Sequence, residues 1–374
     1  MTEDLEMPEV SDVHGLPALD RGRPVPARHA RHASLARNLG VMMLAWIGLW
    51  SGVGCGEVGS PPRVATPGGD LETPLVLVAT TGMIGDMAAS IAGDRGMVTV
   101  LMGEGVDPHL FKPTASDVRR LLAADLVLHN GLFLEGRMGS ILSRVEGPLG
   151  VSVAVAGDLP ESTLLRPDGA EAHPDPHVWM DVQAWSSTIE PIVTALCELD
   201  PDGCDSFRAN ASVLQSDLTA LDHYVREVIG SIPPDHRVLV TAHDAFGYFG
   251  RAYGLEVRGI QGISTESEAG LADMNRVVQM LVDGKIPAVF VESSVSEKNV
   301  RALVEGAGAQ GHQVVIGGEL FSDAMGATGS WEGTYPGMID HNASIITTAL
   351  GGDVPDGGFR AWRSSRVSKE TGVN

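Results

Sequence analysis

Residues 205–232 read DSFRANASVLQSDLTALDHYVREVIGSI, a stretch without proline whose only glycine lies near its end. Apolar residues recur along it at helical spacing and form one stripe: Val213, Leu214, Leu218, Leu221, Val225 and Ile229. Such a stripe predicts one long helix with a buried face, which Pro233 and Pro234 end. A helix of about 25 residues is about 37 Å long. We expect this rod to hold two lobes rigidly and to allow only a small hinge motion.

Short apolar runs alternate with helical patterns on both sides of this helix. Strands are predicted at residues 75–80, 98–101, 126–129, 151–156, 237–241, 257–260, 288–291 and 313–317. Helices are predicted at 83–92, 116–124, from 245, and at 271–282, 297–306 and 335–350. This alternation predicts mainly parallel sheets covered on both faces. The expected fold class is therefore α/β: two parallel-sheet lobes, residues 74–203 and 233–350, joined by a rigid helix at 204–232.

The start of the chain has the pattern of an export signal. Arg28, Arg31 and Arg37 precede an uncharged apolar run, residues 39–54, which ends at Cys55. Residues 1–54 are therefore predicted to be a signal peptide with a long leader, because the apolar run is shorter than the roughly 20 residues of a membrane-spanning helix. The sequence Gly-Val-Gly-Cys resembles a lipobox, so Cys55 is the predicted site of lipidation. A plain signal peptide or short anchor is the alternative.

Two further segments are expected to lack regular structure. Residues 55–73 are rich in Gly, Pro and Thr and are predicted to be a flexible tether between the lipid anchor and the folded lobes. Residues 351–374 are Gly-rich and polar and are predicted to be a disordered tail.

The charge and the remaining cysteines restrict the environment. The formal net charge is −22, which argues against nucleic acid binding because phosphate contacts need clustered Lys and Arg. If Cys55 carries lipid, Cys197 and Cys204 remain. In an oxidising compartment these two are expected to form a disulfide, with two unpaired buried thiols as the alternative.

Four candidate metal ligands lie at wide intervals along the chain: His109, His177, His243 and Asp323. Their spacing excludes a local metal finger. Each lies after a predicted strand or in a loop, and ligands of open α/β sheets bind beyond the carboxyl ends of strands. Two fall in each lobe, so a cation would be held from both sides. Three imidazoles and one carboxylate suit tetrahedral Zn²⁺, or Mn²⁺ at higher coordination if the carboxylate binds through both oxygens.

The residues around these candidates favour a fixed site. Asp107-Pro108 and Asp175-Pro176 immediately precede the first two histidines, so proline fixes the backbone just before each imidazole. Carboxylates often orient metal-binding imidazoles through the second ring nitrogen. The candidates for this role are Asp181, Glu266 and Glu292, with helix caps as the alternative.

Six ordered motifs resemble those of the solute-binding lipoproteins of zinc and manganese ABC importers, the TroA-like and ZnuA-like family. They are GVDPHLFKPTASDV (105–118), DPHVWMDV (175–182), LVTAHDAFGYFGRAYGLEV (239–257), GISTESEAGLADM (262–274), AVFVESSVSEKNV (288–300) and LFSDAMG (320–326). The resemblance covers about residues 74–350 and implies two α/β lobes joined by one long helix. It places the family's four metal ligands at His109, His177, His243 and Asp323.

The resemblance also implies a function and a location. The metal would be handed to a membrane permease powered by a cytoplasmic ATPase, and the chain would not be an enzyme. We expect a monomer on the periplasmic or cell-surface side of the cytoplasmic membrane, held there through its lipid anchor only.

The choice of metal and two other functions stay open. Zinc-dedicated relatives often carry a His-rich loop before the second histidine, where this chain has only EAHPDPH with His173, and some manganese-dedicated relatives have Glu at the position of His243. Zn²⁺ and Mn²⁺ are therefore joint candidates, ahead of iron.

The alternatives to a metal-import function are an exported zinc-dependent hydrolase and a surface adhesion lipoprotein with a structural metal. The hydrolase is disfavoured because a catalytic zinc keeps one coordination position open and because H-E-x-x-H and G-x-S-x-G motifs are absent from the sequence.

Overall fold

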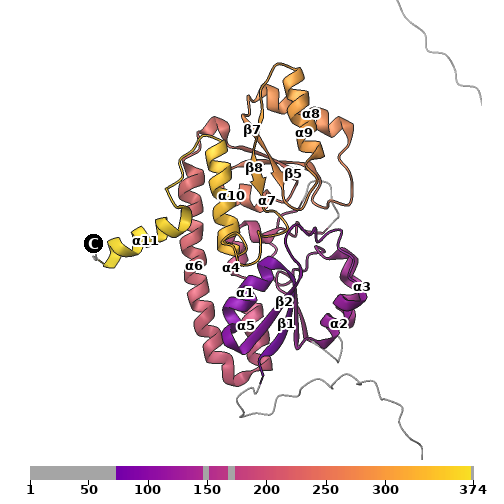
Figure 1. Cartoon of the computed structure of the whole chain (residues 1–374), viewed down its shortest axis with the longest axis vertical. Coiled ribbons are helices and arrows are strands. Elements are labelled where there is room, and N and C mark those ends of the chain that lie inside the picture. The colour runs from indigo at the N-terminus through magenta and orange to yellow at the C-terminus, as the bar shows by residue number, and fades with distance from the viewer. Residues whose placement is uncertain (1–72, 146–150, 167–172, 372–374) are drawn as a thin grey trace, which may run out of the picture. The chain divides into compact units, whose positions relative to one another are not determined.

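A computed structural model describes residues 73–145, 151–166 and 173–371 (Figure 1). All of them belong to one compact unit, Val58–Asn374. The predicted signal peptide, the lipidation site Cys55 and the tether up to residue 72 lie outside the described residues.

The N-terminal lobe is built on a four-stranded parallel sheet in the order β2-β1-β3-β4. Its strands are β1 Leu75–Thr81, β2 Gly96–Met102, β3 Leu126–His129 and β4 Val151–Ala154. Its helices are α1 Gly82–Ala92, α2 Ala115–Ala123, α3 Gly139–Val145, α4 Val182–Ser186 and α5 Ile189–Leu199. The central strands β1 and β3 are buried along nearly their whole length, as expected for a parallel sheet covered on both faces.

The C-terminal lobe repeats this plan with two parallel strand pairs. Strand β5 Val238–His243 pairs with β6 Glu256–Gln261, and β7 Ala288–Glu292 pairs with β8 Val315–Leu320. Strand β5 also lies beside β7. The helices are α7 Gly247–Tyr253, α8 Leu271–Asp283, α9 Lys298–Ala309 and α10 Tyr335–Ala349. The predicted fold class, two parallel-sheet α/β lobes with a long connecting helix, is confirmed.

Helix α6 Cys204–Gly230 connects the lobes and runs alongside both of them (Figure 1). Its 27 residues correspond to a length of about 40 Å. The disulfide Cys197–Cys204 ties its first residue to α5. The predicted stripe is wrong for Val213, which is 64% exposed, because it lies about 100° around the helix from buried Leu214. Short 3₁₀ turns occur at Gly93–Arg95, Gly136–Met138, Val178–Met180, Pro201–Gly203 and Pro234–His236.

One apolar core is shared by the two lobes. It includes Leu77 of β1, Trp179 of the Val178–Met180 turn, Leu218 of α6 and Tyr335 of α10. Smaller separate clusters fill the other face of each sheet, under α2 and α3 in the N-terminal lobe and under α8 and α9 in the C-terminal lobe. The lobes are therefore packed together on their α6 side.

The tail predicted to be disordered forms a helix instead. Residues Gly358–Thr371 are α11, and Phe359 and Trp362 are buried against Tyr224 of α6, with ring centroids 5.5 and 5.7 Å from that of Tyr224. The prediction of a disordered tail is thus wrong for α11, while residues 372–374 lie outside the described residues. The prediction rested on the polar composition of the tail. It did not take into account that Phe359 and Trp362 are three positions apart and therefore share one face of a helix.

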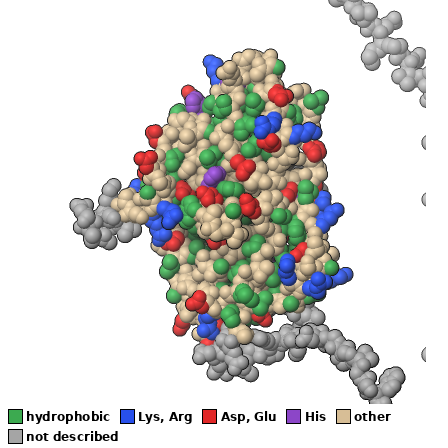
Figure 2. Space-filling model, in the orientation of Figure 1, with side chains coloured by type: hydrophobic (Ala, Val, Ile, Leu, Met, Phe, Trp, Pro, Cys, Tyr) green, Lys and Arg blue, Asp and Glu red, His purple; other side chains and the backbone are tan. Residues whose placement is uncertain are grey.

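The surface of the described residues mixes charges of both signs. On the face drawn in Figure 2, Lys and Arg side chains are scattered among Asp and Glu, unlike the clustered basic surface that binds phosphate. Over these same residues, every helix is too short or too polar to cross a lipid bilayer.

Candidate metal centre

The four predicted ligand residues come together between the lobes, each from a different loop or strand end. His109 lies in the loop after β2, and His177 immediately precedes the Val178–Met180 turn. His243 is the last residue of β5, and Asp323 follows β8 by three positions. All four are buried, with exposures of 5% for His109, 0% for His177 and His243, and 2% for Asp323.

The distances between their side chains match those of ligands around one ion. One donor atom from each residue can be chosen so that all four lie within 4.8 Å of one another. The Nε2 atoms of His109 and His177 are 3.3 Å apart, and the Nε2 atoms of His177 and His243 lie 3.3 and 3.2 Å from the Asp323 carboxylate. Donors about 2.0–2.2 Å from a tetrahedral ion lie roughly 3.3–3.6 Å from one another. This arrangement could hold one transition-metal ion.

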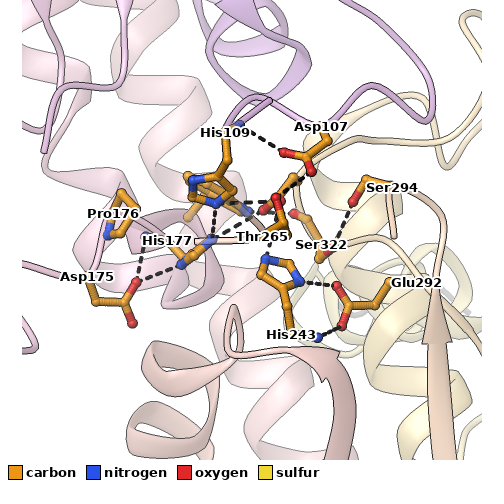
Figure 3. A network of polar contacts seen from close by, with 12 residues as sticks. Asp107, His109, Asp175, Pro176, His177, His243, Thr265, Glu292, Ser294 and Ser322 are labelled. Atoms are coloured by element: carbon orange, nitrogen blue, oxygen red, sulfur yellow. Dashed lines mark hydrogen bonds and ion pairs between the residues drawn. The ribbon is translucent and has the colours of Figure 1, made fainter. Parts of the chain in front are cut away.

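Two of the imidazoles are oriented by carboxylates at their other ring nitrogen (Figure 3). The Nδ1 atom of His177 lies 2.7 Å from Asp175 Oδ1, and the Nδ1 atom of His243 lies 2.5 Å from Glu292 Oε2. A carboxylate there keeps the proton on Nδ1, so the Nε2 lone pair is directed into the site once a metal displaces the Nε2 proton. The second oxygen of Glu292 accepts the backbone N–H of His243 at 2.8 Å, so both ring and backbone are fixed.

Asp323 is held by its loop rather than by partners of its own carboxylate. Asn342 of α10 accepts from the Phe321 N–H at 2.9 Å and donates to the Phe321 carbonyl at 2.7 Å. The indole of Trp179 donates to the Ser322 carbonyl at 2.8 Å. Neither carboxylate oxygen of Asp323 makes a hydrogen bond of good geometry within the described residues. Buried polar atoms are normally satisfied, so two orphaned oxygens facing three imidazoles fit a cation site.

The electrostatics of the centre favour positive charge. Burial, the largest single cause, would lower the pKa of His177, but the Asp175 and Asp323 carboxylates together outweigh it and raise the pKa to about 9. Burial is likewise outweighed at His243, where Glu292 and Asp323 raise the pKa well above its usual value. Burial would raise the pKa of Asp323, yet His243 and His177 hold it well below its usual range. In the absence of metal, the centre therefore holds protons that a bound cation must displace.

His109 differs from the other two imidazoles. Burial is the main cause that lowers its pKa, to about 4, because its ring has no carboxylate at hydrogen-bonding distance. Its closest carboxylate contact is Asp323 Oδ2, 3.8 Å from its Nε2. His109 is thus neutral near pH 7 and ready to coordinate a metal.

Of the three carboxylates predicted to orient the imidazoles, one reaches the centre. Glu292 binds His243, as described above. Asp181 caps α4 by accepting the backbone N–H groups of Gln183 and Ala184, both at 3.1 Å. Glu266 forms an ion pair with Arg137 at 2.7 Å near the surface. Within the described residues, neither the Asp181 nor the Glu266 carboxylate hydrogen-bonds an imidazole.

Asp175 is a second orienting carboxylate, and it was not among the candidates predicted from the sequence. Its signal was the repeated Asp-Pro-His motif, which placed a carboxylate two positions before each of two histidines. In both turns the aspartate Oδ1 accepts the histidine backbone N–H, at 2.8 Å for Asp107 and 2.9 Å for Asp175. This is the hydrogen bond of an Asx turn, which Asp adopts readily.

Comparison with known proteins points to one family. Residues 77–349 match the family described as "Zinc-uptake complex component A periplasmic". The chain is 45% identical over 311 residues to the manganese-binding lipoprotein MntA of Bacillus subtilis (strain 168), covering 83% of this chain and 99% of the relative. It is 50% identical over 277 residues to the zinc-binding protein TroA of Treponema pallidum (strain Nichols), covering 74% of this chain and 89% of the relative. The solved structure of the Treponema pallidum protein matches with a TM-score of 0.72 and 48% identity, over 74% of this chain and 99% of that chain.

Proposed function

Because the chain belongs to this family of periplasmic zinc-uptake components, we propose that it binds a divalent transition-metal ion outside the cytoplasm and delivers it to an ABC importer. The family resemblance found in the sequence is confirmed. We propose His109, His177, His243 and Asp323 as the ligands. The observation that carries this assignment is the convergence of four buried donors, from four separate segments, to within 4.8 Å.

The cargo that we propose is Zn²⁺ or Mn²⁺. The names of the relatives support both, since one is called manganese-binding and another zinc-binding. Asp323 is also compatible with either metal. One carboxylate oxygen would complete a four-coordinate Zn²⁺ site, and binding through both oxygens would give the higher coordination that Mn²⁺ accepts. The Irving–Williams order favours zinc in purified protein, so metal analysis of protein from its native envelope is the measurement that identifies the cargo.

We also propose that the chain is a binding protein and not an enzyme. Four protein donors fill the coordination of a tetrahedral ion, whereas a catalytic zinc site has three protein ligands and an open position for water.

The partners of the protein would be the importer's permease and ATPase, and the protein would act as a monomer. We propose an extracytoplasmic location with anchoring by lipid at Cys55; the word lipoprotein in the name of the Bacillus subtilis relative supports this.

The assignment of ligands is tested with His243→Ala. We expect one Zn²⁺ or Mn²⁺ per chain in the parent protein and an affinity lower by at least about 100-fold in the variant, because removing even a partner of a ligand costs 10- to 100-fold. Calorimetric titration measures both quantities, and circular dichroism checks the fold. His223→Ala, at an exposed position of α6, is the matched control and should bind as the parent does. Unchanged affinity and stoichiometry in His243→Ala would remove that residue from the site.

A further inference from the structure

The two Asp-Pro-His turns use their aspartates differently. In the second turn, Asp175 binds both the backbone and the ring of His177. In the first turn, Asp107 Oδ1 binds the backbone N–H of His109, while Oδ2 accepts the hydroxyl of Thr265 at 2.5 Å (Figure 3). Thr265 belongs to the C-terminal lobe, in the loop between β6 and α8. The turn that carries His109 is therefore held from the opposite lobe.

The residue after Thr265 makes a second contact with the same region. Glu266 pairs with Arg137 of the N-terminal lobe at 2.7 Å, and Arg137 Nη1 lies 3.5 Å from the carbonyl oxygen of Leu110, the neighbour of His109. We name Asp107, Thr265, Arg137 and Glu266 the clasp. Thr265 is 9% exposed, whereas the Arg137 and Glu266 side chains are 34% and 50% exposed. The Asp107–Thr265 bond is thus the shielded half of the clasp.

The other ligands do not depend on the clasp. The neighbours of His177 are joined to the C-terminal lobe by buried bonds: Trp179 donates to the Ser322 carbonyl, and the hydroxyls of Tyr335 and Tyr248 donate to the carbonyls of Trp179 and Asp175. His243 is fixed by Glu292 within its own lobe. Among the described residues, His109 has neither a carboxylate hydrogen-bonded to its ring nor a buried hydrogen bond of this kind to the C-terminal lobe. Its position is set by its turn, and the turn is bound across the lobes through Asp107.

We propose that Thr265 is a positioning residue that keeps His109 on the metal and so sets the rate of metal release. This inference rests on the proposed function. When the Asp107–Thr265 bond is made, the His109 turn is tied to the lobe that supplies His243 and Asp323. When it opens, His109 is the ligand free to withdraw, and the other three stay in place.

The test is the release of Zn²⁺ from loaded full-length protein into a chromogenic chelator, followed by stopped flow. Thr265→Val keeps the side-chain shape but removes the hydroxyl, and we expect release to be roughly tenfold faster, the effect of losing one hydrogen bond to a charged group. Thr265→Ser retains a hydroxyl and should restore the parent rate. Thr219→Val is the matched control, because that hydroxyl bonds only within α6, to the Gln215 carbonyl.

Two combinations separate positioning from a general loss of stability. In a His109→Ala background, Thr265→Val should change the release rate little, because the positioned ligand is gone. Glu266→Gln breaks only the exposed ion pair and should accelerate release less than Thr265→Val does. An unchanged rate in Thr265→Val, or an equal acceleration with and without His109, would overturn the inference while leaving the proposed function intact. Parent-like Zn²⁺ affinity in His109→Ala would instead count against the proposed ligands.

Discussion

At the residue scale, the directions of two of the three imidazoles, His177 and His243, are decided by the carboxylate on the second ring nitrogen. Glu292 contacts both the ring and the backbone of His243, so a single carboxylate fixes the Nε2 lone pair inside the centre. Asp181 is also a carboxylate close in sequence to the centre, but it serves as the cap of α4. The two residues therefore allow the orienting and the structural roles of an acid to be compared directly.

We predict that Glu292→Gln weakens metal binding about 10- to 100-fold while the fold is retained, because the amide cannot hold the His243 ring as a carboxylate does. Calorimetric titration with Zn²⁺ measures the affinity. The control is Asp181→Ala, which should leave the affinity unchanged and lower the free energy of unfolding by about 1 kcal/mol through loss of a helix cap. Equal affinities in Glu292→Gln and the parent would contradict the orienting role.

Metal affinity should rise with pH throughout the range from 6 to 9. The pKa of His177 is raised to about 9 and that of His243 is raised well above its usual value, so both imidazoles are protonated in metal-free protein near neutral pH. Zn²⁺ binds only neutral imidazole and must displace those protons. His109, with a pKa lowered to about 4, adds nothing above pH 6.

The measurement is calorimetry at pH 7 in buffers of different ionisation enthalpy, which counts the protons released. We expect about two protons per metal ion. Competition with a chelator at several pH values gives the slope of affinity against pH. A flat profile between pH 6 and 8 would show that His177 and His243 are already neutral before metal binds.

The sequence predicted the four residues whose side chains converge between the lobes, but only part of what surrounds them. His109, His177, His243 and Asp323 were accessible because each lies after a predicted strand or in a loop and matches a family motif. The role of Thr265 was not accessible, because its bond to Asp107 joins residues 158 positions apart. Of the carboxylates, the local pattern could not separate Glu292 from Asp181 and Glu266, since only the packing of β5 against β7 places Glu292 beside His243.

At the element scale, long runs and stripes of apolar residues predicted the positions of helices and strands, whereas isolated aromatic residues did not. The strands β1, β3 and β7 are buried apolar runs, and α6 has a stripe that spans the whole helix, so their positions followed from the sequence. Helix α11 contains only two buried aromatic residues among polar neighbours, and its docking site on α6 is formed by tertiary contacts. Helix α11 is therefore stabilised by its packing against α6, which the local sequence pattern does not reveal.

We predict that removal of α11, by ending the chain at Asp353, lowers the free energy of unfolding by about 3 kcal/mol because Phe359 and Trp362 lose their burial. Metal affinity should be retained, since α11 packs on α6 and α10. Chemical denaturation and calorimetric titration measure the two effects. Arg366→Gln is the control: it removes an exposed ion pair to Glu227 and a cation–π contact with the Trp362 ring, and should cost about 1 kcal/mol, clearly less than the truncation. A parent-like unfolding midpoint without α11 would show that the helix is not docked in solution.

At the scale of the whole molecule, the two sides of the lobe interface differ in character. On the α6 side, one apolar core continues from the N-terminal sheet through α6 into α10. Near His109, the contacts across the interface are polar: the Asp107–Thr265 bond and the exposed Arg137–Glu266 pair. Separating the lobes widely would expose the shared core to water, at a cost of roughly 25 cal/mol per Å² of apolar surface. Breaking the polar contacts costs far less, since water replaces them.

This asymmetry predicts that metal loading moves the lobes only slightly, with the change concentrated at the His109 turn. Spin labels at Leu122 in α2 and Leu271 in α8 report on the separation of the lobes, because both side chains are exposed, 59% and 78%, and belong to different lobes. We expect the distance distributions of metal-free and Zn²⁺-loaded protein to overlap within their widths, and the radius of gyration from scattering to be the same within error. A label at exposed Leu110, next to His109, should instead change its mobility on loading. A large shift between Leu122 and Leu271 would mean that the shared core opens, and the clasp could then no longer be the step that limits release.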